Sequence, residues 1–302
     1  MILPPAALAV PGSDPASPDA ADPRLICPPQ ALFDDAACRA ALAAALPGQT
    51  GTKAVRAEAV RILAAANAQG RAAIAAALTA RPFAARQAIR SYAWLADRLI
   101  VTLDVVQTHL HPAPNPTEGE RISLIAIGGY GRGEMAPFSD VDLLFLTPWK
   151  MTPWAESLIE DMLYILWDLK LKVGHASRTV KDSIRQARDD MTIRTALLEM
   201  RPLAGDADLA RTLRERLQAE LFRQTAPQFI EAKLAERAER HRKQGGQRYV
   251  VEPNVKEGKG GLRDLQSLYW IAKYVHGVDD LSLIHISEPT RLRRISYAVF
   301  CL

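Results

Sequence analysis

The stretch GGYGRGEMAPFSDVDLLFL, from Gly128 to Leu146, decides the fold of this 302-residue sequence. An apolar run, residues 122–127, precedes its first two glycines, and its last six residues, 141–146, form a second apolar run. Short apolar runs bounded by glycine are typical of buried strands. We therefore predict two strands joined by a glycine-rich turn.

Two aspartates lie at the start of the second predicted strand, in the order Ser139, Asp140, Val141, Asp142. Side chains two apart in a strand point to the same face, so both carboxylates should enter one pocket while Val141 points away. Like charges so close repel unless cations lie between them. Mg²⁺ prefers hard oxygen ligands, commonly carboxylates together with phosphate oxygens, so we predict a magnesium site at Asp140 and Asp142.

The glycine-rich turn supplies groups suited to phosphate. Gly128 and Gly129 allow the backbone to approach a polyphosphate closely, and Ser139 adds a hydroxyl donor. Arg132 matches phosphate with its planar guanidinium, although its place near Glu134 equally permits a structural ion pair. The Gly-Lys-Ser/Thr ending of a Walker A loop is absent, and no G-x-G-x-x-G opens a helix here.

The rest of the chain is mostly helical in pattern. Residues 52–110 carry an apolar face at three- and four-residue steps, interrupted near Pro82, and residues 154–169 repeat this spacing. A third strand is predicted over residues 173–179. The predicted divisions are a mobile lead-in over 1–50, a helical region over 51–112, a catalytic core over 113–206, a helical region with a glycine-rich loop over 207–281, and a non-native tail over 282–302.

Composition restricts the class of protein. Lys and Arg number 38 against 34 Asp and Glu, a surplus of +4 that is too small to indicate a nucleic-acid partner. Three cysteines without CxxC spacing argue against a disulfide framework and against structural zinc. The start, MILPPAALAVPG, lacks a basic signal region, and no run of 18 apolar residues follows, so we expect a cytoplasmic protein with no membrane partner.

The pattern GG-x-GR-x-E…P-x-SD-x-DLL resembles the signature of the polymerase-β-type nucleotidyltransferases. Three further stretches, WDLKLKVGHASRT, ARDDMTIRTALLEMRPLAG and VEPNVKEGKGGLRDLQSLYWIAKY, resemble the bacterial PII uridylyltransferase/uridylyl-removing enzymes. The resemblance implies an α+β nucleotidyltransferase core with a small mixed sheet, flanked by N- and C-terminal helical regions. It covers only the transferase portion of that family, so the chain is interpreted as a fragment without the uridylyl-removing and glutamine-sensing domains.

The same resemblance implies an activity and its site. UMP would pass from UTP to a tyrosine of the PII signalling protein, with release of pyrophosphate. Asp140 and Asp142 match the metal-binding pair with Mg²⁺, and Gly128, Gly129 and Ser139 match the triphosphate-binding positions. A third carboxylate usually completes such sites; Glu199 is the candidate, with an ion pair to Arg201 as its alternative.

Three alternatives remain open at the level of the sequence. His175 can be interpreted as a general base, although a local structural role is the simpler interpretation. An adenylyltransferase acting on glutamine synthetase would share the same aspartate site. A truncated chain can also persist as an inactive nucleotide-binding module.

Overall fold

The computed structural model describes residues 22–113, 117–243 and 254–277. These residues divide into two compact units. The first contains the chain through Ser183 together with Glu199–Leu213, and the second contains Ile184–Leu198 and the chain from Arg214 onward. None of the described helices is both long and apolar enough to cross a membrane. The predicted non-native tail, 282–302, lies outside the described residues.

A small mixed sheet forms the centre of the first unit. Its strands are β1 (Ser123–Ala126), β2 (Val141–Thr147), β3 (Val173–Thr179) and β4 (Arg201–Gly205), in the order β3-β2-β1-β4. β2 runs parallel to β3, whereas β1 is antiparallel to both β2 and β4. The predicted fold class, an α+β protein with a small mixed sheet flanked by helices, is confirmed.

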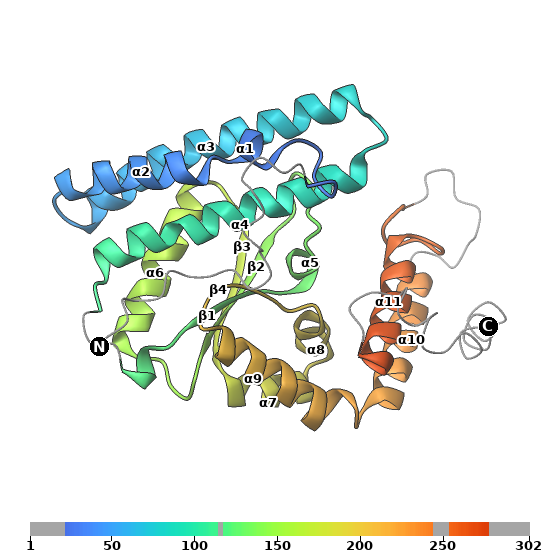
Figure 1. Cartoon of the computed structure of the whole chain (residues 1–302). Helices are drawn as coiled ribbons and strands as arrows, with labels where there is room; N and C mark the ends of the chain where they lie inside the picture. Colours follow the sequence, from blue (N-terminus) through green and yellow to red (C-terminus); the bar gives the residue numbers. More distant parts are fainter. Residues whose placement is uncertain (1–21, 114–116, 244–253, 278–302) are drawn as a thin grey trace. The chain divides into compact units, whose positions relative to one another are not determined.

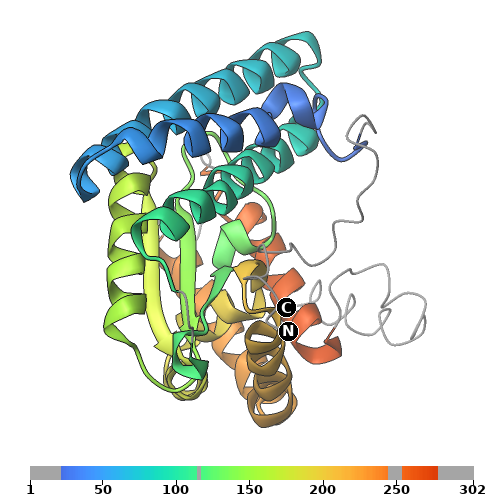
Figure 2. The ribbon, with the colours of Figure 1, turned by 60° about the vertical axis from the view of Figure 1, so that its left-hand side comes forward.

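Two helices, α4 (Ala85–Leu110) and α6 (Pro153–Asp168), cover one face of this sheet, as Figures 1 and 2 show. Outside them pack α2 (Asp35–Ala45) and α3 (Thr52–Ala80). Val141, Leu143 and Phe145 of β2 belong to the same buried cluster as Leu99 of α4 and Leu166 of α6. Because side chains alternate along a strand, the residues between them, including Asp142, point to the other face.

The break in the N-terminal helical region follows from proline chemistry. α3 ends at Ala80 and α4 begins at Ala85, with Pro82 in the corner. Proline cannot donate a backbone hydrogen bond and restricts the residue before it, so a helix rarely continues through it. The backbone N–H of Arg81 still donates to the carbonyl of Ala77 (3.0 Å) and closes the last turn of α3. The predicted interruption near Pro82 is confirmed.

The mobile lead-in predicted over residues 1–50 is too long, because residues 22–50 are ordered. Within residues 22–50 the structure has α1 (Pro29–Leu32), α2 and the short η1 (Leu46–Gly48). Ile26 and Leu42 are fully buried in the helical cluster. Because these apolar side chains are buried, the segment is ordered although its composition is rich in Pro, Ala and Asp.

The remaining elements of the two units are η2 (Glu118–Glu120), α5 (Gly128–Gly131), α7 (Val180–Asp189), α8 (Met191–Leu198), α9 (Ala207–Leu217), the short π-helix η3 (Gln218–Phe222), α10 (Ala226–Lys243) and α11 (Leu262–His276). The second unit is centred on an aromatic stack, in which the rings of Phe229 and Tyr274 lie 3.9 Å apart at 7°. The Tyr274 hydroxyl shares a 2.7 Å hydrogen bond with Thr225.

Candidate active site

Asp142 is the carboxylate of β2 that faces away from the helical layer. Its partner in the parallel register is Gly174 of β3, and a Cβ atom at Gly174 would lie 2.5 Å from Oδ1 of Asp142. A Cβ at Gly128, which has φ of +59°, would lie 3.3 Å from Oδ2. The carboxylate therefore occupies a space that exists because two neighbouring residues lack side chains.

Asp140, the residue just before β2, interacts electrostatically with the carboxylate of Asp142. Asp140 is exposed and Asp142 is partly buried. Burial, and then the charge of Asp140, raise the pKa of Asp142 above its ordinary value. A carboxylate whose ionised form is disfavoured in this way gains from a cation beside its oxygens. The donor set thus fits a hard divalent cation, for which Asp140 and Asp142 would be the protein ligands.

The predicted third carboxylate has a different setting. Glu199 is buried just before β4, and its Oε2 lies 3.6 Å from Nη1 of Arg132. Arg201, the alternative partner, instead forms an ion pair with Asp97 at 2.8 Å. Among the described residues, no group of three or more His, Cys, Asp or Glu side chains is placed to hold a metal. Glu199 as a metal ligand stays a prediction, and the structure favours its role as the partner of Arg132.

Arg132 lies between two acidic residues. Besides Glu199, its Nε lies 3.9 Å from Glu134, so the ion pair considered from the sequence is present and is joined by a second one. A Cβ at Gly129 would lie 3.7 Å from Nη2 of Arg132, which places the guanidinium beside the glycine-rich turn. Its proposed contact with phosphate stays a prediction.

The side chain of Ser139 forms a hydrogen bond within the turn before β2. Its Oγ accepts a hydrogen bond from the backbone N–H of Ala136 at 3.0 Å. The hydroxyl hydrogen is therefore directed elsewhere and remains usable for a ligand. Ser139 also lines a cavity that does not include Gly128, Gly129, Asp140 or Asp142, so the structure divides the predicted nucleotide-binding residues between two places.

His175 lies on the wrong face of the sheet for a general base acting beside Asp142. It pairs with Leu143 in the register, so its side chain points to the face opposite that of Asp142. The imidazole is exposed and contacts Trp167, with ring centroids 6.1 Å apart. The local structural interpretation is the one that this geometry supports.

A network that sequence reasoning missed holds the glycine-rich turn in place. The Tyr130 hydroxyl donates to Asp97 of α4 at 2.7 Å, and Arg201 of β4 donates to the same carboxylate at 2.8 and 3.0 Å. Arg201 also donates to the backbone carbonyl of Gly131 at 3.2 Å. Burial and the charge of Asp97 raise the pKa of Tyr130, so the phenol stays neutral. α4, α5 and β4 are thereby joined around one carboxylate.

Comparison with known proteins agrees with this arrangement. Residues 116–202 match the family described as the nucleotidyltransferase domain, and residues 228–292 match the family described as GlnD PII-uridylyltransferase. The first match contains the whole sequence from β1 to Arg201. The second includes residues 244–253 and 278–292, which lie outside the described part of the chain.

Individual relatives are similar over most of this chain. A bifunctional uridylyltransferase/uridylyl-removing enzyme of Ruegeria pomeroyi is 60% identical over 250 residues, which cover 82% of this chain and 27% of the relative. The corresponding enzyme of Cereibacter sphaeroides is 58% identical over 257 residues, or 84% of this chain and 28% of the relative. The chain thus spans about a quarter of the length of these relatives. It contains a nucleotidyltransferase domain and is homologous to the bifunctional uridylyltransferase/uridylyl-removing enzymes.

Proposed function

We propose that this chain transfers UMP from UTP to a tyrosine hydroxyl of the PII protein, with Mg²⁺ as cofactor. The names of the relatives and the nucleotidyltransferase match support this reaction class. The observation that carries the proposal is the position of Asp142 between Gly128 and Gly174, next to Asp140. A space kept clear by two glycines around an acidic pair suits a cation and the phosphate oxygens that accompany it.

In the proposed reaction the tyrosine oxygen attacks the α-phosphorus of UTP. The new O–P bond forms as the bond from that phosphorus to the bridging β-phosphate oxygen breaks, and pyrophosphate leaves. The hydroxyl proton passes to solvent, since His175 points to the other face of the sheet. Bound Mg²⁺ would supply charge neutralisation at the phosphate oxygens and a lowered pKa of the attacking hydroxyl.

The protein residues have separate tasks in this proposal. Asp140 and Asp142 hold the cation, and the glycine-rich turn presents its backbone N–H groups to phosphate. The network of Asp97, Tyr130 and Arg201 fixes this turn before the substrate arrives. Preorganised groups of this kind lower the barrier because they need no reordering during the reaction.

The test is transfer of label from α-phosphate-labelled UTP or ATP to purified PII by the full chain with Mg²⁺. Label from UTP is expected, with at least about 100-fold lower rates for Asp140→Asn and Asp142→Asn, because each removes a ligand of the cation. Asp168→Asn, an exposed position at the end of α6, is the matched control and should match wild type.

Three results would contradict the proposal. Label from ATP alone would indicate the adenylyltransferase alternative. No label, from a folded chain that still binds UTP, would indicate an inactive nucleotide-binding module. Near-normal transfer by either aspartate variant would refute the site itself.

A further inference from the structure

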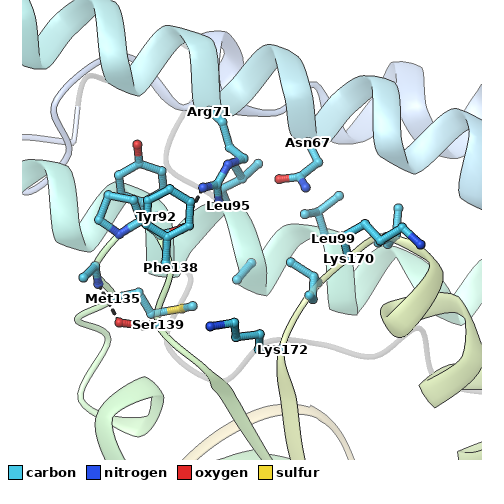
Figure 3. A pocket seen from close by; sticks show the side chains of 15 residues that line it. Asn67, Arg71, Tyr92, Leu95, Leu99, Met135, Phe138, Ser139, Lys170 and Lys172 are labelled. Atoms are coloured by element: carbon cyan, nitrogen blue, oxygen red, sulfur yellow. Dashed lines mark hydrogen bonds between the residues drawn. The ribbon is translucent and has the colours of Figure 1, made fainter.

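The cavity that Ser139 lines in the first unit has the chemistry of an anion site. It encloses about 280 Å³ and lies between α3, α4, the turn at residues 135–139 and the segment 169–172 before β3. Figure 3 shows the ammonium of Lys172 and the amide of Asn67 pointing into it from opposite sides. Leu95 and Leu99, which belong to the buried helical cluster, line its apolar side.

The charged residues that line this cavity are all cations. They are Arg71, Lys170 and Lys172, and no Asp or Glu is among the lining residues. In the described part of the chain, none of these three is within ion-pair distance of a carboxylate, although most other arginines of the unit have an acidic partner. Three cations line one cavity with no carboxylate among its lining residues, so an anion bound there would be attracted by all three.

Arg71 is already fixed in a position suited to binding. Its Nη2 donates to the carbonyl of Pro137 at 2.7 Å. Its guanidinium carbon lies 5.2 Å from the ring centroid of Tyr92 and 5.9 Å from that of Phe138. A guanidinium held by one hydrogen bond and two rings loses little freedom when it donates its other N–H groups to a ligand.

Lys170 at the rim has an unusual backbone conformation. It follows the last turn of α6 with φ of +61°, and it is the only residue other than glycine with positive φ in the described chain. Glycine is the usual residue at this position after a helix. The backbone of Lys170 thus takes a strained conformation at the rim of the cavity, and glycine at this position would relieve the strain.

We propose that this basic pocket binds a phosphate-bearing small ligand, at a place distinct from the space around Asp142. The donors that face it, from Arg71, Lys172, Asn67 and Ser139, suit a group with several acceptor oxygens. Its volume of about 280 Å³ admits pyrophosphate or the phosphate groups of a nucleotide and excludes a folded protein segment. The ligand has two possible sources: the phosphates of the donor or product, and a second nucleotide acting as an effector. The proposal does not depend on the transfer reaction.

The test is calorimetric titration of the full chain with inorganic pyrophosphate and with UTP, in buffer with EDTA and no divalent cation. Lys172→Ala and Arg71→Gln should each raise the Kd about tenfold, the equivalent of ~1.4 kcal/mol. Lys150→Ala removes an exposed lysine outside the cavity and should leave the Kd unchanged. Unchanged affinity in both pocket variants would overturn the proposal.

The Lys170→Gly variant distinguishes a loss of binding from a loss of folding. Glycine relieves the positive φ, so this variant should unfold at or above the wild-type midpoint, while it binds pyrophosphate more weakly by a smaller factor than Lys172→Ala. A second UTP titration, with saturating Mg²⁺ in place of EDTA, separates the two sources of phosphate by stoichiometry. One UTP per chain, weakened by both Lys172→Ala and Asp142→Asn, identifies the phosphates of the donor; two per chain, of which Asp142→Asn affects one, identifies an effector nucleotide.

Discussion

Gly174 shows how a single missing methyl group defines the candidate metal site. We predict that Gly174→Ala weakens Mg²⁺-dependent UTP binding about 10–100-fold, the range seen when groups that orient a metal ligand are changed. The new Cβ would lie 2.5 Å from Oδ1 of Asp142, so the carboxylate must turn away. The measurement is a UTP titration at saturating Mg²⁺, with circular dichroism to confirm the fold.

The matched control is Gly48→Ala, since a Cβ at Gly48 meets nothing within 4 Å. It should bind UTP as wild type does. If Gly174→Ala also bound normally, Asp142 would not be held in the orientation that the site requires.

At the residue scale, alternation along a strand was enough to predict that Asp142 points away from Val141. The role of Asp140 and Asp142 as metal ligands stays a prediction. The sequence did not predict Gly174, although an isolated glycine in a predicted strand is a signal of close approach. It also could not show that Glu199 pairs with Arg132, because that contact joins residues 67 positions apart in the chain.

The short helix α5 depends on α4 and β4 through Asp97. We predict that Asp97→Ala lowers the free energy of unfolding by about 2–4 kcal/mol, because it leaves the buried Tyr130 hydroxyl and the Arg201 guanidinium without their shared acceptor. Affinity for UTP should fall as well, since the glycine-rich turn loses its support. Urea unfolding and UTP titration measure the two effects.

Asp104→Ala provides the comparison within the same helix. Asp104 forms a partly buried ion pair with Arg39 at 2.6 Å, so its loss should also destabilise the chain while leaving UTP affinity unchanged. Equal effects of the two variants on UTP binding would show that the network around Asp97 is only structural.

The elements were predictable where periodicity was strong. β3 was predicted at its observed bounds, and the helix expected over residues 154–169 is α6, Pro153–Asp168. β4 was not assigned, because RPLAG is short and contains a proline; at the edge of the sheet this is tolerated. α2 was missed although Asp34 caps it, accepting from the N–H of Ala37 at 2.9 Å.

Two compact units in one chain should be visible in unfolding experiments. We predict two calorimetric transitions, of which Mg²⁺ raises only the one that belongs to the unit with Asp140 and Asp142, because a ligand stabilises the part that binds it. A single transition that shifts as a whole would contradict this.

The same experiment tests the electrostatics of the site. The folded-state pKa of Asp142 is raised, so its ionisation costs stability as pH rises through that pKa. Without metal, Asp142→Asn should therefore unfold at a higher temperature than wild type near pH 7.5, and this difference should shrink toward acidic pH. Mg²⁺ should stabilise the variant less than wild type.

The space around Asp142 also limits how this protein can diverge. Glutamate is chemically close to aspartate, but at position 142 the extra methylene would push the carboxylate out of a space bounded by two backbone segments. A side chain at position 174 weakens the site for as long as the acid at 142 is kept. Among related sequences, we therefore expect glycine at 174 wherever aspartate is kept at 142, and varied residues at 174 where that aspartate has been replaced. The two positions together would show which related proteins have kept a working site.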